Sequence, residues 1–424
     1  MRTENLALDR APSLSVTLPF LALAPWFAVA AGIVLVVQGP AAFASRWTPD
    51  ALALTHLLTV GFMLQSMCGA MLQFAPVVAG ARIWRPQLAT RLAQVPMLAG
   101  GALLPYALGT SNGKLVLPAA TLLITGIGIF VLSLLAGLWR SHAGARTSWL
   151  LWLALAGLAV TASLGAWLGA GLAGQVTLAL VPLTDLHAAW GLGGWSLVLL
   201  IAVTSVVVPM LQLTPRFPRR LQITCATVIS AALGLWTLRL LTSGSTDGQA
   251  PAMDVTLTAA VIFAVALLML ILRSRRPVTD ASSLYIRIAT LSIMLIGAWR
   301  LALLADFAPL HAASTDVAVG IVALVGVFVA AISGMLYKIV PFMLWVRLSR
   351  LYGARRAPAT GNIIPQSNAR GQFMLFALAL ATLIAAPFVP LLTRPAGALF
   401  AAASLWLAIN IDRAVWVHRR AFAG

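Results

Sequence analysis

Apolar residues along this chain fall into twelve long runs, separated by short polar connections. An α-helix needs about 20 apolar residues to cross the hydrocarbon core of a bilayer, and each run is of that order. In hydrocarbon every backbone N–H and C=O group must be paired within its own segment, so each run is predicted to be helical. We therefore expect an all-α polytopic membrane protein with one transmembrane domain over residues 1–424. The runs fall at about residues 16–38, 51–79, 92–110, 115–139, 148–172, 184–213, 222–242, 253–273, 286–307, 315–346, 372–393 and 397–417.

The second, sixth and tenth runs share a skeleton of small residues and proline. In each, a glycine precedes a proline by 15 residues, and a small residue follows that glycine by eight. The three sets are Gly61–Gly69–Pro76, Gly194–Ala202–Pro209 and Gly326–Gly334–Pro341. This spacing predicts three tandem four-helix units, at about 16–139, 148–273 and 286–417, around a pseudo-threefold axis along the membrane normal. The alternative is coincidence, because glycine and proline are frequent in transmembrane helices.

The composition agrees with a lipid environment: 61% of the residues are hydrophobic, 9% are charged, and the mean hydropathy is +0.97. The net charge of +18 would also suit nucleic acid. With the N-terminus inside, however, 22 of the 28 Lys and Arg residues fall on one side, while the outer connections hold Arg46, Lys114 and Arg394. This asymmetry predicts a protein of the bacterial inner membrane with both termini in the cytoplasm. The positive face is then expected to contact the lipid bilayer and not nucleic acid.

The only long polar stretch, residues 347–371, is rich in Gly, Pro, Asn and Arg and is expected to be a flexible cytoplasmic loop. The two cysteines, Cys68 and Cys225, lie in separate apolar runs. That position excludes a CxxC site and favours buried side chains.

Three of the five histidines are expected at the outer level of the membrane. His56 and His187 lie within the second and sixth runs, and His311 lies in the connection before the tenth. Ionisable side chains at such positions usually face the interior of a helix bundle. Neutral imidazole is a common ligand of metal ions and of haem iron. The alternative is a histidine that is hydrogen-bonded to a carbonyl group of a neighbouring helix.

On an unbroken α-helix, positions i, i+7, i+11 and i+18 share one face. His56 is therefore expected to align with Met63, Met67 and Phe74. An imidazole beside thioether sulfur suits a soft metal ion or a haem iron. The alternative is that the methionines fill irregular gaps between helices.

The two intramembrane histidines differ in their distance from the shared glycine. His187 lies seven residues before it, whereas His56 lies five residues before it. Two residues turn a helix by about 200°, so the two rings are expected to point into different spaces between helices. Gly191 and Gly194, on the face of His187, leave room either for a flat ligand or for a closely packed helix.

Arg239, Arg300 and Lys338 lie within the apolar runs. The two arginines occupy the outer halves of the seventh and ninth runs, where they suit an anionic group such as a haem propionate. They equally suit ion pairs with Asp254 and Asp306. Lys338 lies near the inner end of the tenth run, where snorkelling towards the cytoplasm is the simplest explanation.

The phrases His56-Leu-Leu-Thr-Val-Gly61-Phe and Met335-Leu-Tyr-Lys-Ile-Val-Pro-Phe-Met-Leu-Trp345, together with twelve helices, resemble subunit I of the haem-copper oxidases. A more distant resemblance is to the NnrS-type haem- and copper-containing membrane proteins. The resemblance implies that His56 matches the low-spin haem ligand and that His187 lies on the helix that carries a copper ligand. The family's histidine pairs on the seventh and tenth helices are missing from residues 222–242 and 315–346. A complete oxygen- or nitric-oxide-reducing centre is therefore not expected.

Three functions follow as hypotheses. The first is a membrane protein that binds haem b or copper on the outer side for electron transfer, metal or haem handling, or sensing. Its partners would be other membrane subunits or a periplasmic electron carrier. The second is a transporter of a small solute or metal ion, and the third is a non-catalytic accessory subunit. The candidate cofactor-binding residues are His56, Met63, Met67, His187, Arg239 and Arg300, and those of a transport path are Gln65, Gln73, Arg300 and Lys338.

Overall fold

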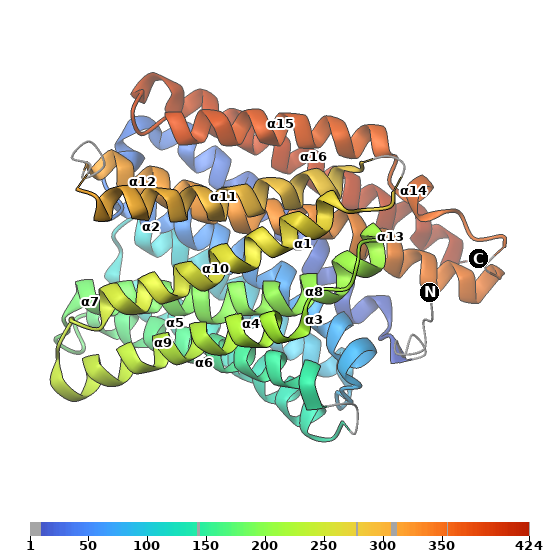
Figure 1. Ribbon diagram of the computed structural model, residues 1–424, viewed down its shortest axis with the longest axis horizontal. Helices are drawn as coiled ribbons and strands as arrows, with labels where there is room; N and C mark the ends of the chain where they lie inside the picture. The colour runs from blue at the N-terminus through green and yellow to red at the C-terminus, as the bar shows by residue number, and fades with distance from the viewer. Residues whose placement is uncertain (1–9, 142–144, 277–278, 307–311, 354, 424) are drawn as a thin grey trace. The chain divides into compact units, whose positions relative to one another are not determined.

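A computed structural model describes residues 10–141, 145–276, 279–306, 312–353 and 355–423 of the chain. These residues form helices and connections, and there is no strand among them. Twelve of the described helices are long and apolar enough to cross a membrane. This confirms the predicted all-helical, multi-pass architecture, which Figure 1 shows in chain order from blue to red.

The chain forms two compact units. The first consists of Met71–Arg275 with the N-terminal residues up to Val16, and the second consists of Thr17–Ala70 and the chain from Arg276 onward. These limits differ from those of the three predicted repeats, whose arrangement as four-helix units stays a prediction.

In the first unit, the sixth span, which consists of α7, η4 and α8, packs along α6. Consecutive helices such as α4 and α5 lie side by side. Short connections make such neighbours antiparallel. The unit contains α4 (Pro86–Gly109), α5 (Gly113–Trp139), α6 (Ala145–Leu172), α7 (Leu180–Ala189), η4 (Trp190–Leu197), α8 (Val198–Gln212), α9 (Arg219–Ser243) and α10 (Gln249–Leu272).

In the second unit, α15 packs along α16, and α11 packs along the tenth span (Figure 1). The unit contains α1 (Leu14–Gln38), η2 (Gly39–Phe43), α2 (Pro49–His56), η3 (Leu57–Met63), the start of α3 (Leu64–Ala79), α11 (Ala281–Leu304), α12 (Ala313–Ile321), η6 (Val322–Val329), α13 (Ala330–Tyr352), α14 (Thr360–Ile363), α15 (Gln366–Ala385), η7 (Pro390–Leu392) and α16 (Thr393–Ala423).

The three helices with the shared skeleton each contain one π-helical turn, with hydrogen bonds that run over five residues instead of four. These turns are η3, η4 and η6, and they are the π turns among the described residues. Each begins four residues before the aligned glycine, which is Gly61, Gly194 or Gly326. Turns η3 and η6 also pack against each other in the second unit. Because π turns are rare and are often found at functional sites, this common register singles out the three helices.

Two of these turns lie at close contacts between helices. A Cβ atom on Gly61 would lie 2.4 Å from Cδ1 of Phe27 in α1. A Cβ atom on Gly157 of α6 would lie 2.3 Å from the carbonyl oxygen of Gly194. Glycine is required at both positions because any side chain would push the helices apart.

The polar stretch before the eleventh span is more helical than the sequence predicts. Helix α13 continues to Tyr352 and α15 begins at Gln366, so the connection is shorter than the predicted loop of residues 347–371. The short helix α14 interrupts it. Amphipathic residues such as Arg347 and Arg350 continue the tenth helix beyond its apolar part, which a search for apolar runs does not detect.

A buried polar network connects four helices of the second unit. The hydroxyl groups of Tyr285 and Tyr337 both donate to Oε1 of Gln372, at 2.6 and 3.1 Å. The amide nitrogen of Asn410 donates to the Tyr337 hydroxyl at 3.0 Å, and that of Gln372 donates to the carbonyl of Ala403 at 3.0 Å. These bonds join α11, α13, α15 and α16, and they pair polar groups that lipid could not satisfy.

Candidate functional site

His56 is the last residue of α2 and immediately precedes the π turn η3. Its Nδ1 lies 2.8 Å from the carbonyl oxygen of Leu52, one turn earlier in the same helix. A carbonyl oxygen can only accept, so Nδ1 carries the hydrogen and Nε2 carries the lone pair. The ring is partly buried. A histidine that ligates a metal is held in this way, with its other nitrogen donating to a backbone carbonyl.

Met63 and Met67 are buried, with 2% and 6% of their surface exposed. Their alignment with His56 was predicted for an unbroken α-helix, but the π turn η3 begins directly after the histidine, ends at Met63 and precedes Met67. A π turn accommodates about one extra residue, which corresponds to a rotation of about 100°. The methionines therefore keep a common face with each other, and His56 is rotated away from it.

His187 lies in α7, three residues before η4. Its Nδ1 is 3.0 Å from the carbonyl oxygen of Thr161 in α6. A Cβ atom on Gly165 would lie 2.9 Å from Cε1 of the ring, so the imidazole packs directly on the backbone of α6. This is the hydrogen bond to a neighbouring helix that the sequence offered as the alternative to a metal ligand.

The glycines beside His187 admit a close helix. A Cβ atom on Gly191 would lie 3.3 Å from Cγ2 of Thr161, and Gly194 meets Gly157. Thr161 of α6 thus fills the space beside Gly191, whereas a Cβ atom on Gly194 would lie 2.3 Å from Cε3 of Trp190 in the same span. That the two histidines point into different spaces between helices stays a prediction; both precede π turns that begin at the same position relative to the glycine.

The two outer arginines differ in exposure. Arg239 is exposed, and its Cδ would lie 3.2 Å from a Cβ atom on Gly248. Arg300 is partly buried in α11. Their role as contacts for an anionic group stays a prediction. His311 lies outside the described residues.

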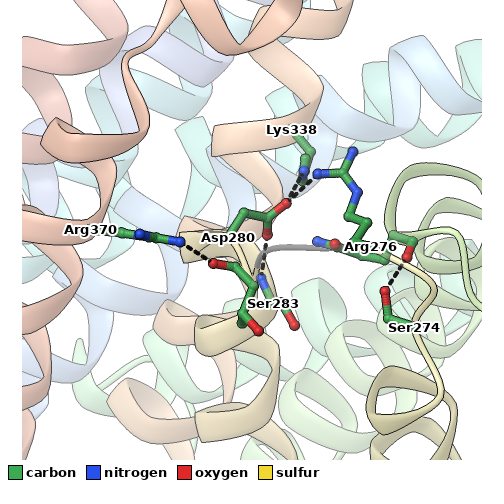
Figure 2. Close-up of polar contacts among 8 residues, drawn as sticks. Ser274, Arg276, Asp280, Ser283, Lys338 and Arg370 are labelled. Carbon is green, nitrogen blue, oxygen red and sulfur yellow. Dashed lines mark hydrogen bonds and ion pairs between the residues drawn. The ribbon is translucent and has the colours of Figure 1, made fainter.

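Lys338 forms a partly buried ion pair in the second unit. Its ammonium group donates to Oδ2 of Asp280 at 2.5 Å, and Arg276 donates to the same oxygen at 2.7 Å. The other carboxylate oxygen accepts the backbone N–H of Ser283 at 2.9 Å and so caps α11. Figure 2 shows Lys338 and Arg276 converging on Asp280, with Arg370 on the carbonyl of Thr279. The Lys338 and Asp280 side chains are 13% and 6% exposed.

This ion pair gives Lys338 a partner that the snorkelling interpretation did not include. The side chain is turned towards a carboxylate at the start of α11, which neutralises it at less cost than bare hydrocarbon would. The sequence did not indicate Asp280 as the partner of Lys338, because Asp280 lies in the connection before an apolar run and not within the run. The N-cap pattern of an aspartate before Ala-Ser-Ser could have indicated it.

Gln65, a candidate for a transport path, is fully buried two residues after η3. Both its amide nitrogen and its amide oxygen lack a hydrogen-bond partner among the described residues. Gln73 is only partly buried. A buried amide without partners is costly, which makes Gln65 an unusual residue for a purely structural position.

The side chains that are present limit which cofactor fits. Among the described residues, no group of three or more His, Cys, Asp or Glu side chains is placed to hold a metal ion. One imidazole is enough to hold haem iron, and the bond of Nδ1 to Leu52 leaves the lone pair of His56 on Nε2. A copper ion would need ligands besides His56, and the alignment of Met63 and Met67 with His56 holds only for an unbroken α-helix, which η3 interrupts. The donor set therefore fits a haem with one histidine better than a copper centre.

Compared with protein-family models and with curated proteins, the sequence gives no match.

Proposed function

We propose that this protein binds haem b at the outer end of its second span through Nε2 of His56, and serves electron transfer, haem handling or sensing. Copper is the less favoured cofactor, because it would need ligands besides His56. The proposal also includes the resemblance to haem-copper oxidase subunit I, without the binuclear centre. The observation that carries it is the Nδ1–H bond of His56 to Leu52, at 2.8 Å, directly before a π turn.

The common register of η3, η4 and η6 supports the proposed threefold repeat. Coincidence of glycine and proline would not require a π turn to begin at the same position in the second, sixth and tenth spans. A repeat does require it, because equivalent helices inherit the same irregularity. Within the second unit, two of the three turns, η3 and η6, pack against each other.

The chain's own residues would hold and orient the cofactor. A bound haem would supply the one-electron chemistry. His56 would hold the iron, and the carbonyl of Leu52 would fix the ring and raise the basicity of Nε2. Arg300 remains the candidate for an anionic group of the cofactor, since it is partly buried on the outer half of its span.

The test is to purify the full chain from haem-replete cells, record its absorption spectrum and measure its iron and copper content. The expected result is a haem band with about one iron per chain. A colourless preparation that also fails to take up added haem would contradict the proposal.

A transporter is the second candidate, and the buried charges and amide favour it. Lys338, Asp280 and Gln65 place polar groups inside the apolar part of the protein, and such groups often mark solute or ion pathways. Against it, the spans run as unbroken helices through Pro76, Pro209 and Pro341, whereas transport sites often use discontinuous helices. Solute uptake into proteoliposomes that is lost in the Lys338→Ala variant would favour transport, provided that the purified wild-type protein shows no haem spectrum.

A further inference from the structure

An exposed group of basic and aromatic residues lies where the connection after α3 crosses the end of α5, in the first unit. We call it the inner rim; it consists of Arg82, Trp84, Arg85, Trp139 and Arg140. The backbone N–H of Arg82 donates to the carbonyl of Gly137 at 3.1 Å, which fixes the connection on α5. A Cβ atom on Gly137 would lie 3.2 Å from the carbonyl of Arg82, so the contact is tight.

The side chains of the inner rim point outwards. Trp84 is 65% exposed and Trp139 is 82% exposed, and the three arginines are exposed as well. The guanidinium carbon of Arg85 lies 4.8 Å from the centroid of the Trp84 ring. Tryptophan with arginine at the end of a span is typical of the membrane–water interface, where the ring lies among the headgroups.

A basic residue occupies the N-cap position of α4, where a side chain that accepts hydrogen bonds is usual. Arg85 is the N-cap residue, has φ of 42°, and makes no side-chain capping bond. By contrast, Thr48 caps α2 and Asp280 caps α11 with side-chain oxygens. A helix N-terminus stabilises an anion by about 0.3–1 kcal/mol and is destabilised by a cation. An external anion would satisfy both this end of α4 and the arginines.

The helices that carry and surround the inner rim supply no counter-charge. Between Asp50 and Asp185 the chain contains no acidic residue. The arginines of the rim therefore find no carboxylate within the helices α4, α5 and α6 that carry and surround them. Their exposed position beside Trp84 and Trp139 leaves the arginines open to the headgroups of a membrane surface.

We propose that the inner rim binds the phosphate group of an acidic membrane lipid. Arg82 and Arg85 contact the phosphate, since guanidinium groups bind phosphate oxygens in a bidentate manner. Trp84 and Trp139 flank the headgroup. This site is independent of any cofactor at His56.

The test compares the full-length protein in nanodiscs of phosphatidylcholine with and without phosphatidylglycerol. Thermal unfolding midpoints and bound lipid by native mass spectrometry are measured. The acidic lipid is expected to raise the midpoint and to remain bound, and the shift should shrink at high salt. In the Arg82→Gln/Arg85→Gln double variant the shift and the bound lipid are expected to be lost.

Arg46→Gln is the matched control, because Arg46 also lies over a tryptophan ring, 4.4 Å from the centroid of Trp47. Arg46 precedes the second span, whereas the inner rim follows it. Arg46→Gln should retain the full lipid shift. The single variant Arg82→Gln is a control for misfolding, because it keeps the backbone hydrogen bond from residue 82 to Gly137 of α5. It should lose part of the lipid-induced shift of the unfolding midpoint. An unchanged shift in the double variant overturns the proposal. A shift produced by inorganic phosphate in detergent overturns the lipid as its source.

Discussion

His56 and His187 both donate an Nδ1–H to a backbone carbonyl, but the carbonyls belong to different elements. His56 bonds within its own helix, to Leu52, whereas His187 bonds to Thr161 and ties α7 to α6. The first arrangement constrains only the ring, and the second contributes to the packing of the unit. At the scale of single residues, the two histidines therefore have different tasks despite similar positions in the sequence.

Substitution should separate these tasks. His187→Ala removes a bond between helices and is expected to lower the free energy of unfolding by about 0.5–1.5 kcal/mol. His56→Ala should have a smaller effect on the protein without cofactor, since it removes only a bond within one helix. Thermal unfolding of both variants checks this. Equal losses of stability would show that His56 also serves packing.

Asp280 should be more important for stability than Lys338. Lys338→Met leaves Asp280 with Arg276, but Asp280→Asn leaves two cations beside a neutral group, while asparagine still caps α11. Loss of one partner from a buried pair costs about 3–5 kcal/mol, and Asp280→Asn is expected near that value. The double variant should recover part of the loss. A larger effect of Lys338→Met than of Asp280→Asn would contradict this account of the charges.

At the scale of elements, the π turns are the features that position the candidate site. Turn η3 rotates His56 relative to Met63, and its glycine allows α1 to approach closely through Phe27. The sequence indicated these helices through glycine and proline spacing. It did not indicate the π turns, because hydrophobic periodicity does not distinguish a single wide turn from an α-helical one.

Gly61→Ala tests the close approach. Its added Cβ would overlap Phe27, so we expect a loss of about 1–3 kcal/mol. Gly128→Ala in α5 is the control, because no neighbouring atom lies within 4 Å of its added Cβ. That variant should gain about 0.5–1 kcal/mol from helix propensity. Unfolding midpoints of both are compared, and equal effects would argue against a tight contact between α1 and η3.

At the scale of the whole molecule, the apolar runs predicted the twelve spans, because burial in lipid requires continuous helices with few charges. Span ends were less predictable, since polar residues such as Arg350 continue the tenth helix. The partner of Lys338 was not predictable from periodicity, because Asp280 is distant in sequence. The chemistry of His56 was predictable only as a candidate, since its orientation depends on local hydrogen bonds.

The orientation of the chain is predicted from its basic residues and can be measured. Thr246→Cys, in the connection after α9, should react with a membrane-impermeant maleimide added to intact cells. Gly361→Cys, in the connection before α15, should react only after permeabilisation. Both sites are exposed, and the native cysteines Cys68 and Cys225 are buried. The reverse labelling pattern would overturn the predicted cytoplasmic termini.

The most direct test of the central claim is the haem spectrum of His56→Gly titrated with free imidazole. We expect this variant to lose the haem band of the wild type and to regain it as imidazole replaces the missing ring, while His187→Gly keeps the band throughout. Retention of the band in His56→Gly, or its loss in His187→Gly alone, would contradict His56 as the ligand.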